Sequence, residues 1–377
     1  MNLDLDDEHE LFRSSVREFA EGVIAPIAEE LDATGRFPVA EVRQAGTLGL
    51  LGVPFPEELG GAGADTLAYA LTIEELARID SSFAITVAAH VSLGTMPIYL
   101  FGSAAQKARW MPPLAAGVEL AAFGLTEAEA GSDAGATRTR ARSEGDEWVI
   151  DGSKMFITNA GTELSSCVTI TARTGDDEIS NLIVPNGTPG YQPGPPLKKM
   201  GWKSSDTRPL SFDGARVPAD HLLGERGNGF RQFLEILDGG RISVAALGLG
   251  LAQGAYEQAL AYARARQQFG RPISKFQAIQ FKLADMETEI AAARGLVYRA
   301  AWLKDQGRAF AHAASIAKLY TAELSRRVVN EAVQVHGGYG YMDEYPISRF
   351  YRDQKVLEIG EGTNEVQRLV IARGIGM

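Results

Sequence analysis

The spacing of apolar residues along this chain changes twice, and this double change limits the folds open to it. Over 1–120 apolar side chains recur three and four residues apart, the period of one helix face. Over 121–225 short runs rich in β-branched residues take over, and helical spacing returns over 226–377. A chain of 377 residues is also too long for one ordinary core. We expect an α+β protein of three domains: an N-terminal helical domain, a middle antiparallel β domain and a C-terminal four-helix bundle.

The helical segments have recognisable ends. Helical spacing predicts helices over 11–20, 67–79, 240–266, 274–305 and 309–336. Pro54, Pro56 and Gly60-Gly61 predict a loop between the first two helices. Gly337-Gly338 predicts the end of the last one, because glycine readily adopts the conformation that closes a helix.

The middle segment has the signs of a small antiparallel domain. Strand-like runs at 147–150 and 154–158 flank Asp151-Gly152, a dipeptide typical of hairpin turns, so a hairpin is predicted there. Further strands are predicted at 167–171 and 182–184. Several prolines between 189 and 196 then exclude a helix.

Composition narrows the class of protein. Hydrophobic content of 45% and charged content of 23% are those of a globular chain, and no run of about 18 uninterrupted apolar residues predicts a membrane span. The acidic first residues lack the features of a signal or transit peptide. The single cysteine, Cys167, fits a reducing cytoplasm. The net charge of −11 argues against binding to nucleic acid or to a membrane surface.

Two other patterns do not indicate a site. The glycine-rich segment 248–254 lacks the spacing of the dinucleotide fingerprint and lies inside a helical run, so close helix packing explains it better than a Rossmann fold. The five histidines are scattered without ligand spacing, so we expect no metal site.

Five segments could hold a ligand, and each also has an ordinary explanation as a loop, strand or helix end. They are 123–133, 156–159, 264–270 followed by Gln277, 334–338 and 359–368. An aromatic ring and a hydroxyl two apart on a strand, Phe156 and Thr158, suit a planar ring. Basic and amide groups at a helix end can clamp a pyrophosphate. Glu361 stands between two glycines just before Thr363, a helix N-cap, which is an unusual place for a structural carboxylate.

In this order, the segments resemble the acyl-CoA dehydrogenase family, of a short- or medium-chain-like bacterial type. The resemblance covers the chain from about Asp6 to Gly376 and implies two helical domains around a β domain. The most specific matches are L-T-E-A-E-A-G-S-D (125–133), K-M-F-I-T-N (154–159), S-D-T-R (205–208), R-Q-Q-F-G-R-P-I (266–273), Q-V-H-G-G-Y-G (334–340) and E-G-T-N-E-V-Q-R (361–368).

The resemblance implies FAD-dependent α,β-dehydrogenation of an acyl-CoA thioester to a trans-2-enoyl-CoA. In the family, a glutamate at the position of Glu361 abstracts the α-proton and hydride passes to flavin N5. Because that proton is weakly acidic, the base needs a water-poor site that raises its basicity. Some branches place the base on the long helix, directly before the equivalent of Arg241. Gly240 occupies that place here, which leaves Glu361.

The resemblance assigns the other roles residue by residue. The implied FAD contacts are Phe123, Leu125, Thr126, Gly131, Ser132, Phe156, Ile157, Thr158, Arg266, Gln268, Phe269, Gln277, Gln334, Val335, His336, Gly337, Gly338, Thr363 and Glu365. The implied substrate contacts are Ser132, Leu237, Asp238, Arg241, Glu361 and Gly362. In relatives the 334–338 segment reaches the FAD of an adjacent subunit, so a homo-oligomer, a dimer of dimers, is expected. Electron-transferring flavoprotein is the implied electron acceptor, and fatty acid or amino acid catabolism the implied setting.

The chain departs from many relatives at two positions. Phe156 stands where they have Trp, and Gly360 where they have Tyr, so the length and branching of the acyl group stay open. The rival functions on the same fold are an acyl-CoA oxidase and a flavin monooxygenase, and a rival of another class is a non-enzymatic flavin- or DNA-binding relative. Oxidases are generally longer, and monooxygenases do not need the carboxylate at 361.

Overall fold

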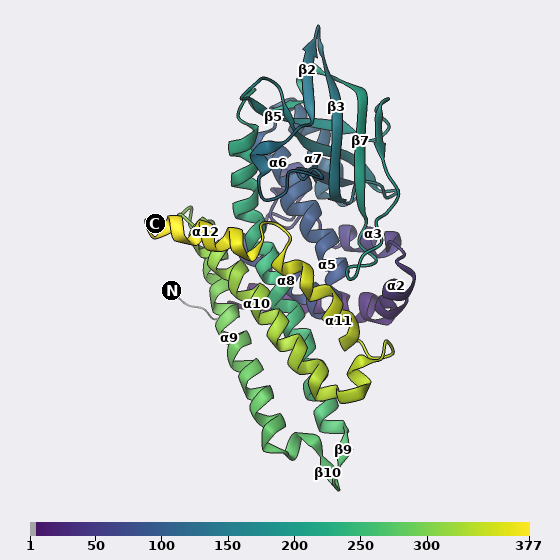
Figure 1. Cartoon of the computed structure of the whole chain (residues 1–377), viewed down its shortest axis with the longest axis vertical. Helices are drawn as coiled ribbons and strands as arrows, with labels where there is room; N and C mark the ends of the chain where they lie inside the picture. The colour runs from purple at the N-terminus through teal and green to yellow at the C-terminus, as the bar shows by residue number, and fades with distance from the viewer. Residues whose placement is uncertain (1–4) are drawn as a thin grey trace.

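The computed structural model describes residues 5–377 as an elongated molecule, with a β domain at one end of a long helix and helices around the rest (Figure 1). The helical, β, helical order is confirmed. The N-terminal helices are α1 (Asp7–Phe19), α2 (Ala28–Thr34), α3 (Val39–Thr47), α4 (Thr66–Ile79), α5 (Ser81–Ala88), α6 (Met96–Phe101) and α7 (Ala104–Ala115). Both helices predicted in this part of the sequence are present, as α1 and α4.

One N-terminal stretch is apolar throughout. Helices α5 and α6 are joined by the π-helical segment η4 (Ala89–Thr95) into a continuous run, Ser81–Phe101, with a mean hydropathy of 1.5. Its length and composition would allow it to cross a membrane, but 78% of its most apolar window is buried inside the protein. This burial is typical of a core helix.

The β domain is one twisted sheet. Its strands are β1 (Leu120–Gly124), β2 (Arg140–Glu144), β3 (Glu147–Thr158), β4 (Ser165–Arg173), β5 (Ile179–Pro185), β6 (Tyr191–Pro193), β7 (Thr207–Pro218) and β8 (Leu222–Leu223). They lie in the order β6-β7-β3-β2-β4-β5-β8, and β1 pairs with β4. Most neighbours are antiparallel as expected, whereas β1 and β2 each pair with β4 in parallel.

The hairpin predicted at Asp151-Gly152 is wrong. Residues 147–158 form the single strand β3, whose pairing with β7 shifts register between Ile150 and Gly152. The Asp151 carboxylate accepts a hydrogen bond from the Gly214 N–H of β7 at 2.8 Å, and Gly152 has φ +145°. The dipeptide therefore forms a β-bulge, and its backbone angle at Gly152 is one that glycine adopts far more readily than other residues.

The C-terminal region contains three long helices, α8 (Gly229–Ala265), α9 (Gln277–Asp305) and α10 (Ala311–His336), and two shorter ones, α11 (Ile347–Asp353) and α12 (Asn364–Gly374). The short strands β9 (Gln267–Gln268) and β10 (Arg271–Pro272) form the tip opposite the β domain (Figure 1). Helix α10 ends at Gly337 as predicted. Helix α8 begins at Gly229 and not near 240, because Gly239-Gly240 interrupts the apolar spacing without ending the helix.

The glycines of α8 allow it to lie against α4. A Cβ atom on Gly250 would come within 2.1 Å of the Glu74 carbonyl oxygen, and one on Gly254 within 2.1 Å of the Arg78 carbonyl oxygen. The interpretation of 248–254 as a close-packing segment is confirmed.

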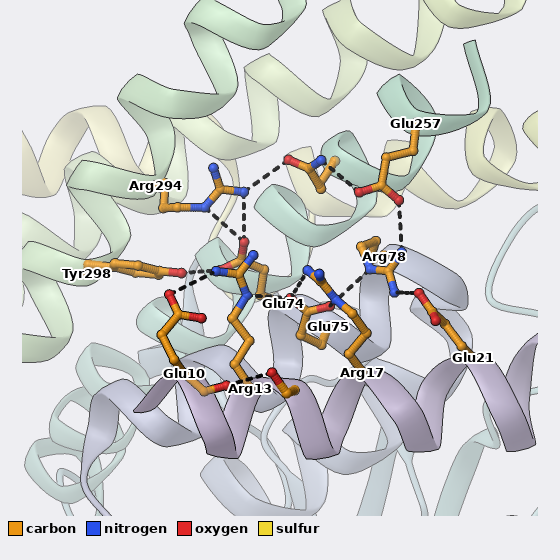
Figure 2. A network of polar contacts seen from close by, with 12 residues as sticks. Glu10, Arg13, Arg17, Glu21, Glu74, Glu75, Arg78, Glu257, Arg294 and Tyr298 are labelled. Carbon is orange, nitrogen blue, oxygen red and sulfur yellow. Dashed lines mark hydrogen bonds and ion pairs between the residues drawn. The ribbon is translucent and has the colours of Figure 1, made fainter. Parts of the chain in front are cut away.

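A network of arginines and glutamates ties α1 to α4, α8 and α9 (Figure 2). The buried Glu75 carboxylate accepts hydrogen bonds from Arg13, Arg17 and Arg78 at 2.8 to 3.0 Å. Its neighbour Glu74 accepts from Arg294 and from the Tyr298 hydroxyl at about the same distances. Charged groups buried this way are stabilised only when they are paired and hydrogen-bonded, as they are here.

Candidate active site

Glu361 lies in a turn between the short 3₁₀ segment η9 (Gln354–Glu358) and α12. Its backbone is left-handed, with φ +50°, and that of Gly362 has φ +88°. Thr363 closes the turn as the N-cap of α12, accepting a hydrogen bond from the Val366 N–H at 3.2 Å. A non-glycine residue in this conformation is strained, and such strain is concentrated at functional sites.

One carboxylate oxygen of Glu361 is buried without a partner, although the residue as a whole is only partly buried. Its Oε2 atom has no exposed surface and no hydrogen bond. Burial raises the pKa of Glu361 to about 7, although the positive charges of Lys318 and Arg241 oppose the shift. A carboxylate of this kind is a suitable proton acceptor near neutral pH.

The space in front of the carboxylate exists because residue 240 has no side chain. A Cβ atom on Gly240 of α8 would lie 2.6 Å from Glu361 Oε2 and 3.7 Å from a methyl group of Leu93. Leu93 belongs to η4, and π-helical segments often occur at functional sites. Helix α8, η4 and the Glu361 turn therefore meet around one point.

The predicted substrate contacts of α8 lie next to this point. Arg241 is buried and donates to Asp238 and, at 3.3 Å, to Ser315, while its Nε atom has no partner. Burial raises the pKa of Asp238, against the pull of Arg241. Leu237 packs with Leu93 and Leu125 on a small cluster formed by Phe123, Phe233 and Ile236.

That cluster connects α8 with the predicted flavin strand. Phe123 belongs to β1, and β1 lies against η4 so closely that a Cβ on Gly94 would meet the Ala121 carbonyl oxygen at 2.2 Å. Thr126 follows at the end of the strand and is half-buried, whereas Gly131 and Ser132 are exposed in the next loop. The structure thus brings Phe123 and Leu125 to the Glu361 side of the sheet.

The end of β3 carries an exposed aromatic side chain. Phe156 has φ +64° and is 64% exposed, Thr158 is half-buried, and the side chain of Ile157 points into the core of the β domain. Of these residues, only Phe156 and Thr158 can offer side chains to a ligand. The contact predicted for Ile157 is limited to its backbone.

Positive φ angles occur mainly in the segments that resemble the family. Five non-glycine residues among 5–377 have them: Phe156, Asn159, Trp202, Phe269 and Glu361. Four lie inside the segments that resemble the family, and Trp202 lies just before another, S-D-T-R. The sequence motifs therefore coincide with unusual backbone geometry.

A second group of predicted residues lines an open cavity of about 450 Å³ at the β9–β10 end. Its lining includes Arg266, Gln268, His336, Gly337 and Gly338. The ring of Tyr262 stacks on His336 with centroids 4.4 Å apart. Val335 also lines the cavity, whereas Phe269, Gln277 and Gln334 are exposed near it without lining it.

The β9–β10 tip lies at one end of the molecule's long axis, whereas α12, which follows Glu361, lies near the middle (Figure 1). Helix α8 starts beside β5, where the Gly229 carbonyl accepts from Asn181, and ends at the β9–β10 tip. Its 37 residues span about 55 Å. The remaining predicted contact, Glu365, is exposed at the first turn of α12 beside Glu361.

The residues present fit a flavin dinucleotide. An exposed ring and a hydroxyl at the end of β3 suit a flat heterocycle, and the guanidinium of Arg266 in an open cavity suits a pyrophosphate or an adenosine. Both features combine apolar surface with a few polar groups, as cofactor sites do.

The sequence reasoning missed four residues around these sites. Lys154, fully buried, donates to the carboxylate of Glu127 at 2.7 Å, and this pair joins β3 to the loop after β1. Gln367 donates to the carbonyls of Glu361 and Gly362, and Lys318 donates to the latter at 2.8 Å. The position of Lys318 on the same helix face as Ala314 and Thr321 was the available signal, because that face is apolar or small and buried.

Comparisons with known proteins agree with this arrangement. The N-terminal, middle and C-terminal domains of acyl-CoA dehydrogenase match residues 6–118, 122–215 and 227–376. A probable acyl-CoA dehydrogenase of Bacillus subtilis, YngJ, is 52% identical over 376 residues, 99% of each chain. The butyryl-CoA dehydrogenase of Megasphaera elsdenii superimposes with a TM-score of 0.97 at 43% identity over 100% of both chains. An acyl-CoA dehydrogenase of Bacillus anthracis, solved with FAD, has a TM-score of 0.94 at 37% identity over 99% of this chain and 67% of that one. The chain belongs to the acyl-CoA dehydrogenase family.

Proposed function

We propose that Glu361 is the base of an FAD-dependent acyl-CoA dehydrogenase and removes the α-proton of an acyl-CoA thioester. The observation that carries the proposal is the enclosed Oε2 atom, which has no partner in the protein and faces the space left by Gly240. A carboxylate whose pKa is about 7 accepts a proton at neutral pH without the competition of a fixed hydrogen bond.

The chain's own groups would then position the thioester. Leu93 and Leu237 offer apolar surface for the acyl group beside Glu361. The backbone N–H of Glu361 belongs to the strained turn and would donate to the thioester oxygen, where negative charge develops as the proton leaves. FAD, when bound, supplies the acceptor for the β-hydride.

We infer that two copies of the chain hold each FAD. Phe156 and Thr158 at the end of β3 would face the flavin ring, with Thr126 and Ser132 beside them. Arg266, Gln268 and the 334–338 segment lie toward the far end of α8, and they would hold the dinucleotide portion bound to a neighbouring copy. A homodimer is the smallest unit that satisfies this, and a dimer of dimers is the expected assembly.

The relatives support further parts of the proposal. The similarity to a butyryl-CoA dehydrogenase supports a short acyl chain as the first substrate to test. We expect electron-transferring flavoprotein as the electron acceptor, and a cytoplasmic location.

The test is anaerobic bleaching of the flavin absorbance by a panel of acyl-CoAs, from straight C4 to C16 with branched and aromatic thioesters. We expect Glu361→Gln to bind FAD and acyl-CoA and to lose at least about a thousandfold in bleaching rate. Glu331→Gln, which removes a distant carboxylate of α10 paired with Lys282, serves as the control and should behave like wild type.

Retention of a bleaching rate within about tenfold of wild type in Glu361→Gln would reject Glu361 as the base. Rapid peroxide formation in air would identify an oxidase instead. A flavin-free protein that binds duplex DNA would point to the non-enzymatic alternative.

A further inference from the structure

Lys318 is a fully buried lysine in the middle of α10. Its ammonium donates a hydrogen bond to the Gly362 carbonyl at 2.8 Å. Among residues 5–377 it makes no other side-chain hydrogen bond, and no carboxylate oxygen lies within 4.0 Å of it. Glu361 Oε2, on the residue that precedes Gly362, has no hydrogen-bond partner.

A buried ammonium without a paired carboxylate costs stability. The other fully buried lysine, Lys154, has such a carboxylate, Glu127, at 2.7 Å. Lys318 loses its hydration on burial and gains only one hydrogen bond, to the neutral carbonyl of Gly362. Packing of α10 alone would be served better by an apolar side chain at this position, so the cost points to a role at the turn that Lys318 contacts.

The turn has two anchors, which differ in charge. Lys318 holds the Gly362 carbonyl, and the neutral amide of Gln367 donates to the same oxygen at 3.1 Å and to the Glu361 carbonyl at 3.3 Å. A strained turn persists only when its surroundings hold it from several sides. Both anchors act on the two left-handed residues, and only one of them is charged.

The charge of Lys318 also acts on the carboxylate. Burial lowers the pKa of Lys318 to about 8 although Glu361 favours its charged form, and in return Lys318 restrains the rise of the Glu361 pKa. The other groups facing the pair are Arg241 on α8, Tyr69 on α4, Glu358 on η9 and Glu365 on α12. Arg241 is engaged by Asp238, and no group in this set besides Lys318 bonds to the turn itself.

We propose that Lys318 is a positioning residue for Glu361, holding the turn through the Gly362 carbonyl and keeping the carboxylate ionised in its enclosed site. The inference rests on the proposed function of Glu361. Lys318 touches neither the reacting carbon nor the flavin in this role and acts only through the base.

The experiment compares three variants of the FAD-loaded enzyme: Lys318→Met, Lys318→Arg and Gln367→Leu. Lys198→Met removes one exposed lysine from the β domain and controls for the change in net charge. The measurement is the rate of anaerobic flavin bleaching by butyryl-CoA from pH 5.5 to 9. The loss of the positive charge should raise the pKa of Glu361, so the acid limb of the pH profile of Lys318→Met should move upward by about one pH unit. At pH values below the limb, this shift corresponds to about a tenfold loss of rate.

The other variants separate charge from anchoring. Lys318→Arg keeps the charge and should keep the limb in place with a lower rate. Gln367→Leu should lower the rate at every pH without moving the limb. Hydrogen exchange of the peptide 359–368 should become faster in Lys318→Met and in Gln367→Leu, and stay unchanged in Lys198→Met.

An unshifted limb in Lys318→Met, with Glu361→Gln inactive, would overturn the role of Lys318 and leave that of Glu361 intact. Turnover by Glu361→Gln would instead overturn the proposed base. If Lys318→Met does not fold, Lys318→Arg decides, because a limb that moves upward despite the retained charge contradicts the proposal.

Discussion

Two glutamates of this chain, each with a carboxylate oxygen buried in the protein, differ in their hydrogen bonds. Glu75, in the network of Figure 2, accepts hydrogen bonds from three arginines. Burial would raise its pKa, but Arg17, Arg13 and Arg78 hold it below the usual value. Glu361 has two cations nearby and no hydrogen bond at Oε2, and burial raises its pKa to about 7.

The contrast separates a carboxylate that stabilises the fold from one that is available to react. The oxygens of Glu75 are occupied, so it joins α1 and α4 and cannot readily accept a proton. The oxygen of Glu361 is free in an enclosed space, at a cost in stability that the rest of the chain offsets. Burial alone therefore does not identify a base. In Glu361 burial is combined with an oxygen that has no hydrogen-bond partner and that lies beside the space left by Gly240.

We expect the largest effect when the charge of the paired carboxylate, Glu75, is removed. Glu75→Gln leaves three arginines short of a charged partner, and we expect it to lower the free energy of unfolding by about 3 kcal/mol, measured by urea denaturation. The bleaching rate of the folded variant should stay within about twofold of wild type. Glu10→Gln, at the exposed edge of the network, should cost less than about 0.5 kcal/mol. A large loss of bleaching rate in folded Glu75→Gln would contradict the interpretation that Glu75 stabilises the fold and takes no part in the reaction.

The next effect tests the space in front of Glu361. Gly240→Ala places a methyl group where the carboxylate lies, which forces Glu361 aside, and a displacement of roughly 1 Å can cost about a hundredfold in rate. The free energy of unfolding should change little, because alanine favours the helix. Gly239→Ala is the matched control, since its methyl group would meet only the flexible end of Lys304 at 3.4 Å. Equal rates in the two variants would contradict the proposed geometry.

The smallest effect is a difference in pH dependence. The raised pKa of Glu361 means that its contribution to stability is lost as pH rises from about 4.5 through 7. The lowered pKa of Glu75 means that its contribution is lost as pH falls below about 4.5. Relative to wild type, Glu361→Gln should therefore gain about 1–2 kcal/mol between pH 5 and 8. Urea denaturation across this range measures the gain, and a constant difference between the two proteins would show that Glu361 has an ordinary pKa.

The order of helices and strands followed from the sequence because hydrophobic spacing is local. Two local signals failed for one reason, that glycine serves several geometries. Gly152 belongs to a β-bulge where a hairpin turn was predicted. Gly239-Gly240 lies inside α8, although the helical spacing predicted that the helix begins there. Neither could be decided without knowing which element packs against it.

The site was predictable in part. The resemblance identified Glu361 and the segments around it, and the structure places Phe123, Leu125, Leu237 and Arg241 near one another. The roles of Lys318 and Glu127 depend on contacts between residues far apart in the chain. A lysine in a helical run is usually on the surface, so the apolar face that carries Lys318 was too weak a signal to predict its burial.

The 2.6 Å approach between a side chain at position 240 and the carboxylate of Glu361 has a consequence for how such enzymes diverge. The two positions compete for one volume, so a larger side chain at position 240 requires the Glu361 carboxylate to move. Residues 240 and 361 are therefore coupled, and the effect of a substitution at one of them depends on the side chain at the other.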